Sequence, residues 1–184
     1  MAQTPSNMLP IGTKAPKFNL PATNFNESFT FDTVKGKKGT VVVFICNHCP
    51  FVLHVIDEIV RIANDYRVQG IGFVAISSND IEKYPQDAPD KMAGFCLKNH
   101  IDFPYLYDET QETAKAYDAA CTPDFYLYDG QDKLVYRGQL DDSRPSNGIP
   151  INGYDLRNAI DALMFNRKVN EPQKPSIGCN IKWK

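Results

Sequence analysis

Two apolar runs joined by an amphipathic segment constrain the fold of this chain more than any other feature. The runs are GTVVVFI, residues 39–45, and IGFVAIS, residues 71–77, and neither contains a charged residue. Such β-branched runs are typical of strands that are buried on both faces. Between them, apolar residues recur at helical spacing from Phe51 onward, and Gly70 is suited to end that helix. This order predicts a right-handed βαβ unit within a parallel sheet.

The rest of the chain continues the alternation of helix and strand. We expect these further elements in chain order: a helix at about 90–99, a short extended segment at 103–108, a helix at 108–120, a hairpin turning near Asp129 and Gly130, and a closing helix at 155–167. Asp108 and Gln111 have the spacing of a capping box. Residues 169–184 contain prolines and show no clear period, so we expect an irregular tail.

Length and charge narrow the class of protein. A chain of 184 residues with 42% hydrophobic content can bury one sizeable core, so we expect a single domain over residues 1–184. The net charge of -2 provides no basic field for nucleic acid or anionic lipid. The first residues lack a secretory signal pattern, and no apolar run reaches a membrane-spanning length. We therefore expect a cytoplasmic protein that binds neither nucleic acid nor membrane.

One close pair stands out among the five cysteines, whose odd number and spacing do not suggest a secreted disulfide framework. Cys46 and Cys49 form a CxxC sequence where the first buried strand ends and the helix begins. The N–H groups and dipole of a helix N-terminus stabilise a thiolate, so we expect Cys46 to be the nucleophile. Cys49, in the first helical turn, is then the resolving thiol. His48 is expected to lower the pKa of Cys46 further.

This arrangement resembles the thioredoxin fold over residues 38–168, with an N-terminal extension at 1–37 and a C-terminal tail at 169–184. The stretches IGTKAPKFNLPATN and FPYLYDETQETAKAYDAACTPDF resemble the alkyl hydroperoxide reductase and thiol-specific antioxidant (AhpC/TSA) branch, the peroxiredoxin-like redoxins. The resemblance implies a central mixed sheet flanked by helices. It also implies a cis-proline at Pro123 facing the CxxC, with Thr122 offering backbone groups to an extended substrate strand.

Three functions stay open at this point. The first is thiol–disulfide exchange with a disulfide-containing protein or small thiol and an external electron donor, in either direction. The second is a thiol peroxidase in which Cys46 attacks peroxide, although Val43 stands where peroxiredoxins place a Thr or Ser, and no residue was found to supply that hydroxyl. The third is metal binding or delivery through Cys46 and Cys49, with His48 or Cys121 as a further ligand, although no second CxxC or His pair completes a tetrahedral site. We expect no cofactor and no metal, and the sequence leaves the oligomeric state open.

The other three cysteines have separate interpretations. Cys96 lies among apolar residues of a predicted helix and is interpreted as a core residue. Cys121 stands two residues before the predicted cis-proline, so it is either filler or an accessory thiol near the pair. Cys179 lies in the predicted tail, which either simply packs or presents a mobile thiol that could resolve or regulate Cys46.

Overall fold

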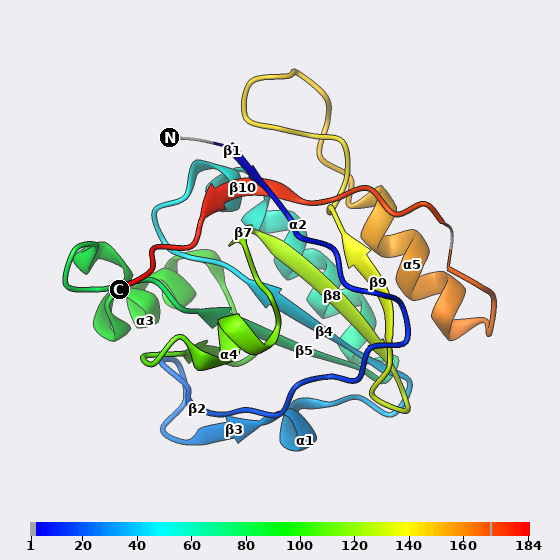
Figure 1. The fold of residues 1–184 in the computed structure, drawn as a ribbon, viewed down its shortest axis with the longest axis horizontal. Helices are drawn as coiled ribbons and strands as arrows, with labels where there is room; N and C mark the ends of the chain where they lie inside the picture. The colour runs from blue at the N-terminus through cyan, green and yellow to red at the C-terminus, as the bar shows by residue number, and fades with distance from the viewer. Residues whose placement is uncertain (1–2, 170) are drawn as a thin grey trace.

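A five-stranded mixed sheet forms the centre of the molecule in a computed structural model that describes residues 3–169 and 171–184. The strands lie in the order β6 (Tyr105–Tyr107), β5 (Ile71–Ser77), β4 (Gly39–Phe44), β8 (Asp124–Asp129) and β9 (Leu134–Gly138). The first three are parallel, whereas β8 runs antiparallel to β4 and to β9 (Figure 1). The predicted βαβ unit and hairpin are confirmed.

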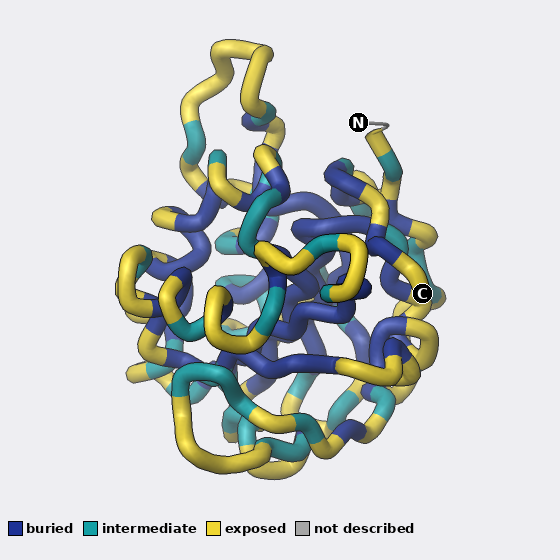
Figure 2. The backbone as a smooth tube through the Cα atoms, turned by 90° about the vertical axis from the view of Figure 1, so that its left-hand side faces the viewer, coloured by how far each residue is buried: buried dark blue, intermediate teal, exposed yellow. Residues whose placement is uncertain are grey.

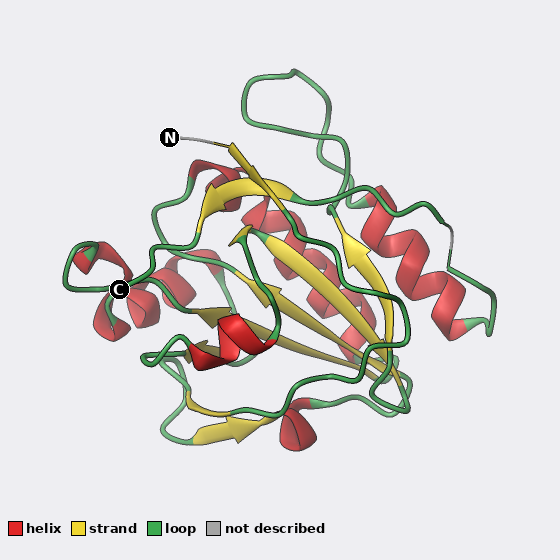
Figure 3. Ribbon diagram, in the orientation of Figure 1, coloured by secondary structure: helices red, strands yellow, loops and turns green. Residues whose placement is uncertain are grey.

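Helices cover both faces of this sheet (Figure 3). One face packs against α2 (Pro50–Arg67), α3 (Pro89–Asn99) and α5 (Tyr154–Met164), and the other against α1 (Phe31–Val34) and α4 (Glu112–Ala116). Strand β4 shows why its run is unbroken: Val41 and Val43 enter the first core, while Val42 and Phe44 enter the second. The expected α/β thioredoxin-like architecture is therefore present.

The start of α4 differs from the predicted capping box. Gln111 has a left-handed conformation, with φ of 66°, and the helix begins at Glu112. The Gln111 side chain makes no cap hydrogen bond, because its amide donates to the carbonyls of Ser78 and Lys182 instead. The Asp108 carboxylate still accepts hydrogen bonds from the backbone N–H groups of Thr113 and Ala114, at 3.4 and 2.9 Å. Asp108 thus satisfies helix donors from a greater distance along the chain than a capping box allows.

The C-terminal segment is not an irregular tail, and that expectation is wrong. Strand β10 (Ile177–Asn180) pairs on one side with β1 (Gln3–Pro5) and on the other with β7 (Cys121–Thr122), both antiparallel (Figure 1). Beyond the strand, the Ile181 N–H donates to the Ala120 carbonyl at 3.1 Å. A strand of four residues has too few positions to show a period, so its partners, rather than its own pattern, define it.

The N-terminal extension forms a small hairpin of β2 (Asn19–Pro21) and β3 (Ser28–Thr30), which is a sheet of its own and not part of the central sheet. The connection between β9 and α5 stands away from the body, and its residues 145–150 are exposed (Figure 2). Within the described residues, no helix has both the length and the apolarity needed to cross a bilayer.

Candidate functional site

The CxxC pair lies where β4 passes into α2, as the sequence predicts. The exposed fractions of Cys46 and Cys49 are 1% and 0%, so both thiols are buried. Helix α2 begins at Pro50, and Cys49 is its N-cap residue. The Leu53 N–H donates to the Cys49 carbonyl at 2.9 Å, which closes the first turn. Cys49 therefore precedes the first turn instead of lying in it, and Cys46 lies three residues further from the helix.

The Thr122–Pro123 loop faces both sulfurs. The peptide bond between these residues is cis, as predicted. Thr122 Oγ1 lies 3.5 Å from Cys46 Sγ. The Thr122 carbonyl oxygen lies 3.2 Å from Cys49 Sγ and accepts a hydrogen bond from it when Cys49 carries its proton. The fold thus brings together four of the residues singled out from the sequence, although they come from segments more than seventy positions apart.

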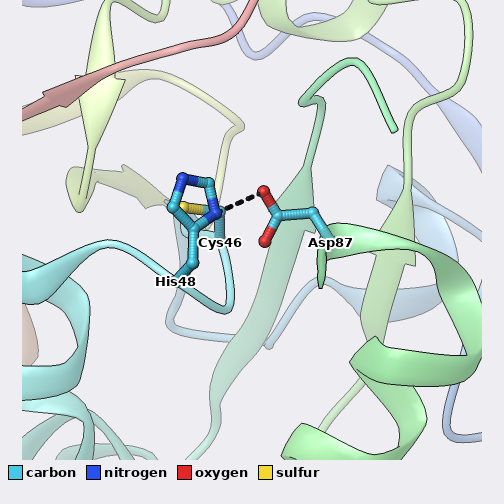
Figure 4. Close-up of side chains that lie close together, drawn as sticks. All are labelled: Cys46, His48 and Asp87. Carbon is cyan, nitrogen blue, oxygen red and sulfur yellow. Dashed lines mark ion pairs between the residues drawn. The ribbon is translucent and has the colours of Figure 1, made fainter. Parts of the chain in front are cut away.

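His48 points toward a buried carboxylate that the sequence analysis missed. His48 Nδ1 lies 2.8 Å from Asp87 Oδ2, and the two side chains face Cys46 (Figure 4). The contact is an ion pair when the ring is protonated, and within the described residues Nδ1 has no partner that meets hydrogen-bond geometry. Asp87 is fully buried and accepts hydrogen bonds from the Asn47 N–H and from Asn79 Nδ2, each at 2.8 Å. These two donors fix the carboxylate beside the histidine.

The sequence does not indicate Asp87 as a site residue, because the segment that contains it is predicted to be a loop. It belongs to the short 3₁₀ helix η1 (Pro85–Asp87), which follows a stretch rich in turn-forming residues. The Asn47 N–H and the Asp87 carboxylate are 40 positions apart. A local pattern of residues cannot predict a contact over this separation. The sequence itself offers only an acidic residue within a polar loop.

An aromatic side chain, Tyr84, and a cationic one, Lys182, extend the site toward the C-terminal segment. The His48 ring is stacked on Tyr84, with ring centroids 5.6 Å apart and an interplanar angle of 7°. Lys182 Nζ lies 5.6 Å from the centroid of the Tyr84 ring. The Lys182 backbone is also fixed, since its N–H donates to Asn79 Oδ1 at 2.9 Å. The C-terminal segment therefore borders the loop that carries His48.

Cys179 is part of this site. Its Sγ lies 2.8 Å from Cys49 Sγ, and its exposed fraction is 1%. In the pairing of β10 with β7, Cys179 lies directly opposite Thr122. The neighbouring Gly178 permits this close pairing, because a Cβ built there would lie 1.9 Å from the Thr122 carbonyl oxygen. Of the two alternatives for Cys179, the mobile thiol is wrong and packing is correct, since strand pairing holds Cys179 in place.

The two remaining cysteines are buried elsewhere. Cys121 Sγ lies 3.7 Å from the Pro123 carbonyl oxygen and 4.0 Å from that of Ser176. Burial raises the pKa of the Cys121 thiol well above its ordinary value. Cys96 lies on the buried face of α3, where burial raises its pKa to about 12. Burial keeps both of these thiols protonated at neutral pH.

Comparison with known proteins agrees with this geometry. The redoxin family profile matches residues 10–151. The chain belongs to the redoxin family. An uncharacterized conserved protein from Geobacillus kaustophilus is 58% identical, with a TM-score of 0.98 over 100% of this chain and 97% of that one. A hypothetical protein from Sinorhizobium meliloti is 45% identical, with a TM-score of 0.95 over 98% of each chain.

More distant structures share the fold of this redoxin. A thiol:disulfide interchange protein of the thioredoxin family from Chlorobium tepidum is 16% identical, with a TM-score of 0.65 over 85% of this chain and 99% of that one. At this identity the likeness establishes the thioredoxin-like fold alone. The comparison with curated proteins gives no match.

The protonation of the redoxin dithiol differs from the sequence-based expectation. The pKa of Cys49 is held far below its ordinary value by its hydrogen bonds with the thiols of Cys179 and Cys46 and with the Val52 N–H. The pKa of Cys46 is raised well above its ordinary value by its hydrogen bond to Cys49, by burial and by the Asp87 carboxylate. The expected low pKa at Cys46 is therefore wrong, and the helix N–H of Val52 lowers the pKa of Cys49 instead.

The same residues of the redoxin form a group of possible metal ligands. Cys46 Sγ, a ring nitrogen of His48 and a carboxylate oxygen of Asp87 lie within 4.8 Å of one another. Cys46 and His48 are among the metal ligands considered from the sequence, whereas the Asp87 carboxylate is added by the structure. Sulfur, nitrogen and oxygen donors together suit zinc. A zinc ion bound there would occupy the Cys46 sulfur, so metal binding and disulfide exchange would compete.

Proposed function

We propose that this redoxin is a thiol–disulfide oxidoreductase that cycles Cys46 and Cys49 between the dithiol and the disulfide. The observation that carries the proposal is the meeting of both sulfurs with Thr122 at the N-terminus of α2. Exchange of this kind requires one sulfur to attack a disulfide and a second sulfur close enough to displace the product. The two cysteines of this site satisfy both requirements.

In the first step Cys46 Sγ attacks one sulfur of the substrate disulfide. A bond forms between Cys46 and that sulfur, the substrate S–S bond breaks, and the other substrate sulfur leaves as a thiolate. Cys46 must lose its proton as it attacks. The His48 ring lies beside Cys46 and can pass this proton to the departing thiolate, while Asp87 keeps the ring in place.

In the second step Cys49 resolves the mixed disulfide. The lowered pKa of Cys49 favours its thiolate, which is the form that attacks Cys46 Sγ. The Cys46–Cys49 bond forms, and the second substrate sulfur leaves. An external dithiol donor then restores the reduced pair by the reverse chemistry. Run backward against a dithiol substrate, the same steps would oxidise it.

Access to the pair limits which substrates can react. The exposed fraction of Cys46 is 1%, so a substrate sulfur reaches it only after local opening. The backbone edge at Thr122, which we expect to bind an extended substrate strand, is paired with Cys179 of β10. The proposal therefore includes a small disulfide, or a protein disulfide that displaces β10 from this edge.

Disulfide exchange by four full-length proteins tests the proposal. Wild type is expected to reduce insulin with a dithiol donor, whereas Cys46→Ser is expected to lose at least about a thousandfold in rate, as nucleophile removal does in other enzymes. Cys49→Ser is expected to accumulate covalent mixed disulfides with its substrate. Cys96→Ser, which removes a buried thiol outside the site, is the matched control and is expected to keep its rate. Full activity in Cys46→Ser would exclude this mechanism.

A thiol peroxidase remains a second candidate because of one contact. The sequence analysis found no hydroxyl to accompany Cys46, but Thr122 Oγ1 lies 3.5 Å from its sulfur, supplied from another strand. A hydroxyl there could hydrogen-bond a peroxide as Cys46 passes to the sulfenic acid. Consumption of hydrogen peroxide and of an organic hydroperoxide separates the two functions. Peroxide turnover that Thr122→Val abolishes, without disulfide exchange, would favour the peroxidase.

A further inference from the structure

Cys49 has a second sulfur neighbour besides its CxxC partner. The 2.8 Å contact joins it to Cys179, which lies 130 positions away in the sequence. Strand β10 holds Cys179 there between two partners, with Gln3 of β1 opposite on one side and Thr122 of β7 on the other. The Ser176 hydroxyl, just before the strand, donates to the Pro123 carbonyl at 2.6 Å. The third sulfur is therefore fixed by backbone pairing on the same loop that borders the dithiol.

We propose that Cys179 is a third redox-active thiol, which takes the disulfide from Cys46 by forming a Cys49–Cys179 bond. This inference rests on the proposed function, because the Cys46–Cys49 disulfide of that cycle is the oxidant. Cys179 Sγ attacks Cys49 Sγ, the new S–S bond forms, the Cys46–Cys49 bond breaks, and Cys46 leaves as a thiolate. One disulfide replaces another, so no outside oxidant or reductant is consumed.

The proton balance of this step also closes within the site. Cys179 gives up one proton as it attacks, and the departing Cys46 takes up one proton. His48 lies beside Cys46 and can deliver that proton. The exchange therefore leaves the total number of protons on the protein unchanged. The equilibrium between the two disulfides depends on their relative stability.

Oxidation of Cys49 makes Cys179 easier to ionise. In the reduced protein the pKa of Cys179 is raised well above its ordinary value by its hydrogen bond to Cys49, by burial and by the negative charge on Cys49. When Cys49 joins a disulfide, it carries no negative charge, so this charge no longer opposes ionisation of Cys179. The third thiol is thus held protonated while the dithiol is reduced and becomes a better nucleophile once the pair is oxidised.

The product state would differ from an ordinary oxidised dithiol. Cys46 would be a thiol again while the protein still held one disulfide, so Cys46 could form a mixed disulfide with a further substrate. Strand β10 would be covalently joined to the N-cap of α2, which keeps the Thr122 edge paired. Cys179 would then serve as a second resolving thiol for the same active site.

Disulfide mapping in Cys46→Ser tests this directly, because that variant cannot form the CxxC disulfide. The reduced full-length variant is treated with oxidised glutathione, alkylated and digested with trypsin. Cleavage places Cys49 in peptide 39–61, Cys179 in 169–182 and Cys121 in 116–133. We expect the variant to lose two alkylation sites and to give a cross-link between peptides 39–61 and 169–182.

Matched variants and wild type make the outcome decisive. The cross-link is expected to disappear in Cys46→Ser with Cys179→Ser and to persist in Cys46→Ser with Cys121→Ser. Partly oxidised wild type is expected to contain the same cross-link beside the internal disulfide of peptide 39–61, which covers the case of a misfolded variant. Absence of the cross-link from wild type and variant, or a cross-link to 116–133 instead, would overturn the inference.

The proposed function and this inference fail in different ways. Wild type that forms the Cys46–Cys49 disulfide and turns over, with Cys179 fully alkylated throughout, would leave the proposed function intact and exclude the third redox thiol. Wild type that forms neither disulfide with oxidised glutathione would remove the proposed function itself.

Discussion

Cys179 and Cys121 lie on neighbouring strands of one small sheet, yet their sulfurs have different surroundings. Both residues are buried, with exposed fractions of 1% and 0%. Cys179 Sγ lies 2.8 Å from the active-site sulfur of Cys49. Cys121 Sγ lies against the carbonyl oxygens of Pro123 and Ser176. Burial therefore does not explain why the two thiols have different neighbours.

The register of the strand pairing explains why the two thiols have different neighbours. Cys179 pairs with Thr122, and the next pair along is Asn180 with Cys121. Because successive side chains of a strand point to opposite faces, Cys179 and Thr122 share the face toward the CxxC. A shift of one residue would exchange the faces of β10. The place of the third sulfur is thus a property of strand pairing, and the predictions below disturb that pairing or the two thiols one at a time.

The largest effect is expected from adding a methyl group at Gly178. A Cβ there would lie 1.9 Å from the Thr122 carbonyl oxygen, so β10 must move away from β7. Gly178→Ala is expected to lower the free energy of unfolding by about 3 kcal/mol, the upper range for overpacking. Thermal unfolding of the reduced protein measures the change, and the Cys49–Cys179 cross-link is expected to weaken with it.

Gly94→Ala provides the control for that substitution. Gly94 lies within α3, and a Cβ there meets no atom within 4 Å. Replacing a helix-interior glycine by alanine is expected to stabilise the protein by roughly 0.5–1 kcal/mol. If Gly178→Ala proved as harmless as Gly94→Ala, the close approach of β10 to β7 described above would be wrong.

An intermediate effect is expected on the thiolate of Cys49. Cys179 is the strongest contributor to the low pKa of Cys49, so Cys179→Ala is expected to raise that pKa and reduce the thiolate population in acid. A hydrogen bond to a charged group contributes about 1.5–3 kcal/mol, which sets the size of the change. Titration of the thiolate ultraviolet absorbance in the reduced protein measures it.

Two variants sharpen this titration. Cys179→Ser keeps a hydroxyl donor beside Cys49 and is expected to retain most of the low pKa while losing the disulfide. Cys121→Ala is expected to leave the titration unchanged, because its sulfur faces other partners. Equal midpoints for wild type and Cys179→Ala would show that Cys179 does not stabilise the Cys49 thiolate.

The smallest effect is expected from Cys121→Ala on stability. Removing one buried sulfur leaves a small cavity, so we expect a loss of about 1 kcal/mol in the free energy of unfolding, with no change in disulfide exchange. Chemical denaturation and the insulin assay measure the two quantities. A large loss of exchange activity would instead assign Cys121 a role in the site and remove the contrast with Cys179.

The parts of this site that the sequence predicts are those with local signals. The β-branched run of β4, the helical spacing of α2 and the CxxC between them are visible within thirty residues, and the resemblance to thioredoxins adds Thr122 and cis-Pro123. Asp87 and the position of Cys179 have no such signal. Each is fixed by contacts across 40 and 130 positions, respectively, which no short window of sequence contains.

The expectation about ionisation failed for a related reason. The low pKa of Cys49 comes first from the thiol of Cys179, which lies 130 positions away in the sequence. The N-terminus of α2 adds a smaller effect through the Val52 N–H. The position of the dithiol was predicted correctly, but the sulfur that carries the charge was not.

The 130-position separation of Cys49 and Cys179 gives the two disulfides different polymer properties. A Cys46–Cys49 bond closes a ring of a few residues, whereas a Cys49–Cys179 bond would turn most of the chain into one macrocycle. By loop-closure entropy, the large ring restricts the unfolded chain by about 5 kcal/mol and the small ring by about 2 kcal/mol. Passing the disulfide from one partner to the other would therefore raise the melting temperature and make the denatured chain more compact, with no change in oxidation level.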